Sequence, residues 1–289
     1  MFNSLITNLL NNRAWLSRTT LLIGEEKLDA LVNAHVLVVG LGGVGSFAAE
    51  FIARAGVGEM TIVDGDVVDP TNRNRQLPAL ATNHGVSKAD IMAERLLAIN
   101  PELKLHVIKE FLRPAAIRDI VLIQPYSYVM DCIDSITPKV TLLSEAYRKG
   151  YNIVSSMGAG GKLDPTKLQV ADLFETRECL LAQYVRKRLK KYGITQGIKA
   201  VYSTEKVMRE SLMRTDGSNF KRSAYGTISY LPAAFGGACA SVVIRDLIGN
   251  PIPELDESVK RLKKKRLLAA QKAKKTKSNG ENNAPTPGV

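Results

Sequence analysis

The stretch HVLVVGLGGVG, residues 35–45, decides the fold of this chain. Residues 35–39 form a largely β-branched run typical of a buried strand, and the run stops at glycines spaced Gly-x-Gly-x-x-Gly. The small, apolar segment 44–55 that follows suits a helix packed closely on a sheet. Such glycines permit a tight bend and close backbone approach to phosphate oxygens, while the start of the helix supplies unpaired N–H donors. The stretch therefore predicts a nucleotide-binding turn formed by Gly40, Gly42, Gly43 and Gly45.

Strand and helix patterns continue to alternate after this turn. The predicted strands cover 60–63, 103–107, 126–130 and 152–156, and the predicted helices cover 87–99, with Ser87 as N-cap, and 137–149. Strands that alternate with helices of this length are typical of a parallel sheet with crossover helices. We therefore expect an α/β fold, a doubly wound, mainly parallel, Rossmann-like sheet with helices on both faces.

The pattern weakens beyond residue 156. Further strands are predicted over 168–173 and 199–203, a basic helix over 180–191, a long loop over 205–226 and an apolar helix over 233–248. We expect an N-terminal helical segment over 1–33, one nucleotide-binding domain over 34–256 and a basic tail over 257–289 that cannot build a core. The net charge of +12 lies mostly in this tail, so the domain itself is only mildly basic.

The composition excludes several classes of protein. No apolar run approaches the roughly 20 residues that a membrane-spanning helix needs, and the first residues lack the pattern of a signal peptide. The cysteines, Cys132, Cys179 and Cys239, are too few and too scattered for a disulfide framework or a zinc site. We therefore expect a cytoplasmic protein with no membrane contact and no zinc. Cys179, in a polar setting, is the candidate for a reactive thiol, whereas His35 and His106 show no recognisable chemistry.

Acidic and basic residues beyond the glycine turn distinguish ATP from NAD. Asp64 ends the second predicted strand, about 24 positions after Gly40, where a carboxylate can accept hydrogen bonds from ribose hydroxyls. Arg75 and Lys88 would place two cations near the switch point of the sheet, which suits a triphosphate and a pyrophosphate leaving group. Asp134, after the fourth strand, could hold Mg²⁺. Singly, these three residues could be solvated or capping residues; together they favour ATP and Mg²⁺ over a nicotinamide cofactor.

The segment GLGGVGSFAAEFIARAGVGEMTIVDGDVVDPTNRNRQL, residues 40–77, resembles the adenylating domain of the ubiquitin-activating-like (ThiF-type) enzymes. The resemblance spans residues 15–250 or so. It implies that Asp64 binds the ribose, that the Arg of an N-x-x-R-Q element binds phosphate, and that a Lys and a further Asp complete the site. These residues would be Arg75, Lys88 and Asp134, flanked by Asn72 and Gln76.

The same family uses an arginine from the N-terminal helix of a partner subunit. The segment WLSRTTLLIGEEKL, residues 15–28, suggests Arg18 for that role. The resemblance thus implies a homodimer with shared sites, in which Arg18, Arg75, Lys88 and Asp134 carry the chemistry.

Other segments narrow the position within the family. Bacterial activators of ubiquitin-like proteins carry two Cys-x-x-Cys pairs, and this sequence has none. The segments 155–176, 185–191, 201–206 and 226–236 instead resemble the branch that cyclises threonylcarbamoyladenosine in tRNA. The resemblance implies an ATP-dependent dehydratase that activates a carboxylate as an acyl adenylate.

Three other functions stay open at this point. The first is an adenylyltransferase acting on the C-terminal glycine of a ubiquitin-like sulfur-carrier protein, and the others are a nicotinamide-dependent oxidoreductase and a non-catalytic RNA-binding scaffold. The expected partners are tRNA and a second copy of the chain, with a sulfur-transfer protein as a further candidate. A basic cluster that could hold tRNA phosphates, or merely form a solvated helix face, consists of Arg186, Lys187, Arg188, Lys190 and Lys191.

Overall fold

The computed structural model describes residues 13–111, 113–123, 125–214 and 223–252. The predictions for the basic tail over 257–289 and for the first 12 residues therefore lie outside the described residues. The chain divides after Ile252. No helix within the described ranges combines the length and the hydrophobicity that a bilayer-spanning segment requires.

A seven-stranded sheet forms the centre of the fold, in the order β3-β2-β1-β4-β5-β7-β6. All neighbouring strands are parallel except β6, which runs antiparallel to β7 at one edge. This arrangement confirms the predicted doubly wound, mainly parallel sheet. The strands are β1 His35–Val39, β2 Glu59–Val63, β3 Lys104–Ile108, β4 Tyr128–Asp131, β5 Ile153–Ser156, β6 Leu168–Asp172 and β7 Lys199–Ser203.

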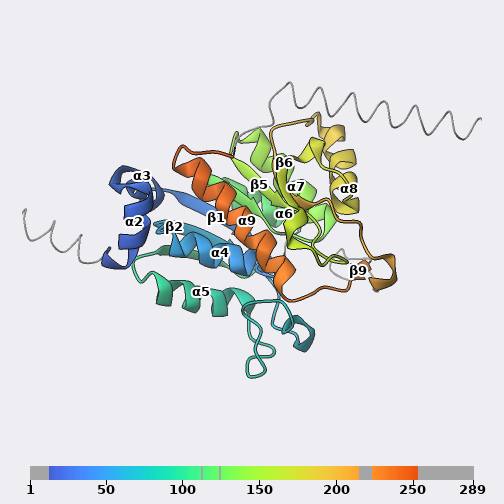
Figure 1. The fold of residues 1–289 in the computed structure, drawn as a ribbon, viewed down its shortest axis with the longest axis horizontal. Coiled ribbons are helices and arrows are strands. Elements are labelled where there is room, and N and C mark those ends of the chain that lie inside the picture. Colours follow the sequence, from blue (N-terminus) through green and yellow to red (C-terminus); the bar gives the residue numbers. More distant parts are fainter. Residues whose placement is uncertain (1–12, 112, 124, 215–222, 253–289) are drawn as a thin grey trace, which may run out of the picture. The chain divides into compact units, whose positions relative to one another are not determined.

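Helices cover both faces of the sheet, because the central strand is apolar on both. Along β1, Val36 and Val38 belong to one buried cluster, while Leu37 and Val39 belong to the other. Residues of α3, α4, α5 and α9 pack in the first cluster, and residues of α6, α7 and α8 pack in the second. Figure 1 shows α4 and α9 side by side over the strands. The helices are α2 Ser17–Ile23, α3 Glu25–Val32, α4 Gly45–Arg54, α5 Lys88–Ile99, α6 Pro114–Ile123, α7 Ile136–Arg148, α8 Leu180–Leu189 and α9 Tyr230–Leu247.

The N-terminal helices are part of the same compact unit as the sheet. Leu31 of α3 lies fully buried in the first core cluster, and α3 contacts α9. Leu16, just before α2, packs so closely on Gly56 that a Cβ there would lie 2.8 Å from Leu16 Cδ1. The segment before β1 is thus anchored at the end of α4.

The structure differs from the sequence prediction in two places. Helix α6 joins β3 to β4 although no helix was predicted there; a crossover between parallel strands generally needs one. The predicted loop over 205–226 contains a hairpin of β8 Leu212–Arg214 and β9 Ser223–Tyr225, whose strands are too short to give a periodic pattern. Single 3-10 turns occur at Ala14–Leu16, Pro70–Asn72, Pro165–Lys167, Leu173–Glu175, Lys190–Tyr192 and Arg209–Ser211.

Candidate active site

The glycine turn between β1 and α4 depends on glycine at two of its positions. Gly40 has φ +90°, a conformation that L side chains rarely adopt, and a Cβ there would lie 3.0 Å from the carbonyl oxygen of Cys132. A Cβ at Gly45 would lie 1.7 Å from the carbonyl oxygen of Gly40. Gly42 is open, because its nearest neighbour would be Gln76 Nε2 at 3.7 Å. The turn is therefore closely packed at Gly40 and Gly45 and open at Gly42, where a phosphate can approach the backbone.

Asp64 is fixed against this turn by two backbone donors. Its side chain is buried and accepts the N–H of Leu41 at 2.6 Å and the N–H of Asp66 at 2.8 Å. Burial raises the pKa of Asp64, and the two backbone hydrogen bonds oppose that rise. Each carboxylate oxygen keeps a second acceptor position, so a carboxylate at the end of β2 remains able to accept ribose hydroxyls.

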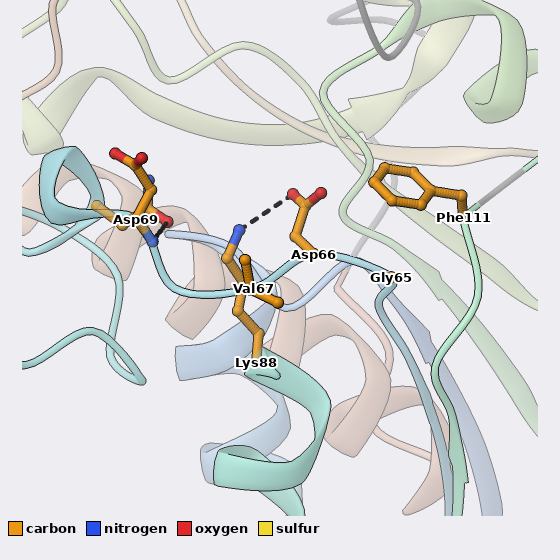
Figure 2. A pocket seen from close by; sticks show the side chains of 7 residues that line it. Gly65, Asp66, Val67, Asp69, Lys88 and Phe111 are labelled. Atoms are coloured by element: carbon orange, nitrogen blue, oxygen red, sulfur yellow. Dashed lines mark hydrogen bonds and ion pairs between the residues drawn. The ribbon is translucent and has the colours of Figure 1, made fainter. Parts of the chain in front are cut away.

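The residues directly after Asp64 in the sequence line a pocket of about 360 Å³. Figure 2 shows Lys88 extending from α5 toward Asp66, with Phe111 on the far side. Lys88 Nζ lies 3.1 Å from Asp66 Oδ2, and the lysine side chain is 5% exposed. A buried ammonium that a carboxylate holds in place is a preformed positive charge. The pocket is lined by Gly65, Asp66, Val67, Asp69, Asn72, Lys88 and Phe111.

The N-x-x-R-Q element lies between this pocket and the glycine turn. Asn72 is buried, and its Oδ1 accepts the N–H of Asp69 at 3.2 Å, so it shapes the 3-10 turn that opens the element. Arg75 donates to the carbonyl of Thr71 at 3.0 Å, and a Cβ at Gly43 would lie 3.4 Å from Arg75 Cγ. Gln76 Oε1 is buried without a hydrogen-bond partner among the described residues. The structure thus brings Arg75 and Gln76 beside the glycine turn.

Asp134 lies at the same edge of the sheet. From β1 the chain proceeds outward to β2 and β3 and then returns to β4 on the other side of β1, so the switch point lies between β1 and β4. The glycine turn follows β1, and the exposed Asp134 follows β4 by three residues. The residue at the N-cap position of α7 is Ser135, whose side chain makes no capping hydrogen bond.

A buried ion pair lies beneath the switch point, and it was not predicted from the sequence. Asp131 and Lys139 are both fully buried, with Lys139 Nζ 2.6 Å from Asp131 Oδ2. The ammonium also donates to Ser155 Oγ at 3.2 Å and to the carbonyl of Ser156 at 2.9 Å. Asp131 Oδ1 accepts the N–H of Ile133 at 3.1 Å, which fixes the turn leading to Asp134. The available signal was a lysine at helical spacing from the apolar residues Leu142, Leu143 and Ala146.

Arg18 does not join this constellation within one chain. It is exposed on α2, which begins directly after Leu16, and Leu16 packs on Gly56 beyond the end of α4. The glycine turn lies at the start of α4, a helix of 10 residues and about 15 Å long. Arg18 and the turn therefore lie at opposite ends of that helix.

The predicted basic cluster is divided by the fold. Arg186 is half-buried, and its Nη1 donates to the carbonyl of Thr176 at 3.1 Å as well as to the Thr176 hydroxyl. It therefore supports the turn before α8. The remaining members, Lys187, Arg188, Lys190 and Lys191, are exposed. Cys179, the candidate reactive thiol, is buried.

Known proteins share this sequence and architecture. The model of the ThiF family matches residues 16–284. The tRNA threonylcarbamoyladenosine dehydratase of Escherichia coli K12 is 38% identical over 257 residues, covering 82% of this chain and 96% of that protein. The enzyme of the same name from Bacillus subtilis 168 is 37% identical over 256 residues, covering 86% and 98%. The solved structure of the Escherichia coli dehydratase in complex with ATP matches with a TM-score of 0.74, covering 82% of this chain and 95% of that chain.

Proposed function

The chain belongs to the ThiF family, and from that premise we propose that it is an ATP-dependent tRNA threonylcarbamoyladenosine dehydratase. One observation carries the proposal. The carboxyl edge of the sheet gathers a glycine turn, a fixed carboxylate and a buried ammonium, in a fold shared with a dehydratase crystallised with ATP. The resemblance inferred from residues 40–77 and the expected fold are thereby confirmed.

The reaction activates a carboxylate so that a ring can close. The carboxylate of the threonylcarbamoyl group attacks the α-phosphorus of ATP, pyrophosphate leaves, and an acyl adenylate forms. The carbamoyl oxygen then attacks the acyl carbon, AMP leaves, and a carbamoyl nitrogen loses its proton. The nucleoside loses the elements of one water. Activation replaces hydroxide, a poor leaving group, by AMP, and no redox cofactor takes part.

The residues of the site have matching roles. Backbone N–H groups of the glycine turn and the start of α4 bind phosphate oxygens, and Asp64 accepts the ribose hydroxyls. Arg75 and Lys88 stabilise the negative charge that develops on pyrophosphate as it leaves. The ion pair of Asp66 with Lys88 holds the ammonium in place before the nucleotide arrives, so little reorganisation is needed during the reaction.

A magnesium ion fits the donors at the switch point. Mg²⁺ prefers carboxylate oxygens, and Asp134 is an exposed acid at the carboxyl end of β4. A Mg²⁺ ion held there would neutralise phosphate charge. Asp134 is therefore proposed as its protein ligand.

Mass spectrometry of tRNA nucleosides tests the proposal. tRNA that carries threonylcarbamoyladenosine is incubated with the protein and ATP and digested under mild conditions. We expect the modified nucleoside to lose the mass of one water, in an ATP-dependent manner. The alternative, adenylation of a sulfur-carrier protein, predicts instead an unchanged nucleoside and ATP–pyrophosphate exchange that requires a peptide ending in Gly-Gly.

The homodimer with a shared site is also part of the proposal. No residue of α2 is buried, and its Leu21 and Leu22 are 87% and 84% exposed. Such exposed apolar side chains suit an interface between copies. Because Arg18 lies at the far end of α4 from the glycine turn, it would reach phosphate only in the site of a second copy.

The tRNA is proposed to contact the exposed basic residues that follow and end α8. Replacing Lys187 and Lys191 by alanine should weaken tRNA binding. The slope of the logarithm of the binding constant against the logarithm of the salt concentration should become less steep by about two, roughly one for each phosphate that is no longer neutralised. Lys27→Ala, which removes an exposed lysine of α3, is the matched control. We also propose a cytoplasmic location, where tRNA and ATP are both present, and a sulfur-transfer partner stays a prediction.

A further inference from the structure

Three potential metal ligands meet at the amino-terminal end of the sheet, away from the glycine turn. His35 is the first residue of β1 and pairs in register with Glu59, the first residue of β2. His106 pairs with Thr61, two positions beyond Glu59. Side chains two positions apart on a strand point to the same face. The register therefore brings both imidazoles and the carboxylate together.

The ligand atoms are close enough to share one ion. Glu59 Oε1 lies 2.8 Å from His106 Nε2 and 3.6 Å from His35 Nδ1, and one ligand atom of each residue lies within 4.8 Å of the others. Ligand atoms of a tetrahedral Zn²⁺ site with bonds of about 2.05 Å are about 3.4 Å apart. The two observed distances lie on either side of that value, so small side-chain adjustments would complete the geometry.

The buried histidine is oriented by a hydrogen bond on its other nitrogen. His35 Nε2 lies 2.9 Å from Thr61 Oγ1, so that Nδ1 is the nitrogen facing Glu59. Metal-binding histidines are commonly oriented in this way by a partner on the second ring nitrogen. His35 is buried, whereas the side chains of Glu59 and His106 are 23% and 33% exposed. A cation would therefore be held on the protein side and open to water on the other.

Two neighbouring groups compete with a cation: the backbone of Pro125, which forms a hydrogen bond with the His35 imidazole, and the ammonium of Lys104. Lys104 Nζ lies 2.9 Å from Glu59 Oε1, the same oxygen that faces both histidines. The lysine side chain is 63% exposed and can turn into solvent without loss of packing. Its ammonium is therefore a displaceable partner of Glu59.

We propose that His35, Glu59 and His106 bind a divalent transition-metal cation of borderline softness, such as Zn²⁺. Two imidazoles and one carboxylate form a donor set that Zn²⁺ accepts, with water in the fourth position. The ion would join β1, β2 and β3 and stabilise the folded state in proportion to its binding. The expectation of no zinc rested on absent cysteine pairs, whereas these ligands come from three separate strands and show no sequence spacing.

Competition with a chromophoric chelator tests the site. Untagged full-length protein is treated with EDTA, dialysed and titrated with Zn²⁺ in the absence of nucleotide. We expect one tight Zn²⁺ per chain and a rise of the thermal midpoint. Co²⁺ should give the intense visible absorption of a four-coordinate ion.

Three variants separate this site from general metal binding. His106→Ala, at a partly exposed position, should lower the Zn²⁺ affinity by about tenfold or more, as loss of a site component does. Lys104→Ala should raise the affinity by up to about fivefold, the range of an exposed ion pair. His84→Ala removes the one other histidine of the sequence and should change nothing. No tight Zn²⁺, an unchanged affinity in His106→Ala, or weaker binding in Lys104→Ala would overturn the proposal.

Discussion

The buried pair beneath the switch point allows a prediction of unfolding free energy. Lys139→Met keeps the length of the side chain but removes its charge and its three hydrogen bonds, to Asp131, Ser155 and Ser156. Among the described residues, the Asp131 carboxylate would keep the N–H of Ile133 and the hydroxyl of Ser155 as donors. Removing one partner of a buried pair costs about 3–5 kcal/mol, because the other charge stays buried without compensation.

That loss is large for a domain whose total stability is about 5–15 kcal/mol. Urea unfolding followed by circular dichroism measures it, and the m value should stay constant while the midpoint falls. Lys149→Met is the matched control, since Lys149 is exposed just beyond the same helix. It should change the unfolding free energy by less than about 0.5 kcal/mol.

A double variant identifies the physical cause. Asp131→Asn combined with Lys139→Met removes both charges but keeps an oxygen that can accept the N–H of Ile133. If uncompensated charge is the penalty, the double variant should recover most of the loss. A loss below about 1 kcal/mol in Lys139→Met, or a double variant as unstable as the single one, would refute the reasoning.

Three further predictions concern the site and the thiols. Asp134→Ala should have the same unfolding free energy as the parent protein because the side chain is exposed. Its turnover should nevertheless be abolished, because the variant loses several kcal/mol of transition-state stabilisation. A parental kcat in the folded variant would place the metal elsewhere. Inactive Arg18→Ala and Lys88→Ala proteins, mixed with subunit exchange, should recover about a quarter of the parental activity, since about half of the dimers are hybrids with one intact site. Inactive hybrid dimers would show that Arg18 does not act in the partner's site. Burial raises the pKa of the Cys239 thiol to about 12, so at pH 8 only about one thiol in ten thousand is ionised. Iodoacetamide should therefore modify Cys239 only in unfolded protein, and the rate of modification of the thiol should rise with pH. Peptide mass spectrometry measures the modification at pH 8. Modification of Cys239 in native protein at the rate of free cysteine would contradict the prediction.

Local sequence was sufficient to predict the fold class and to select the residues of the candidate site, whose roles stay predictions. A strand, a glycine turn and a helix are local features, and 11 consecutive residues, 35–45, contain the strand, the turn and the first residue of the helix. Asp64 and Asp134 could be assigned from one rule of topology, that parallel strands end at a common edge. The strand 199–203 was predicted with the bounds that the structure has, because its apolar residues stand between polar ends.

Other features could not be read from local sequence. The β8–β9 hairpin was missed, since strands of three residues carry little periodicity. Helix α6 was missed although its segment is as amphipathic as that of α7. Arg186 was assigned to an RNA surface because it stands among basic residues, and the fold instead turns it toward the carbonyl of Thr176. Whether a cation faces solvent or backbone is decided by the element packed against it.

The pairings of distant polar groups arise only when whole elements pack together. Lys139 meets Asp131 because α7 returns over the end of β4, and Lys88 meets Asp66 because α5 starts beside the loop after β2. His35, Glu59 and His106 converge only through the register of three strands. Hydrophobic periodicity is a property of neighbouring residues and is therefore legible in sequence, whereas the position of one charge relative to another depends on the packing of helices and strands.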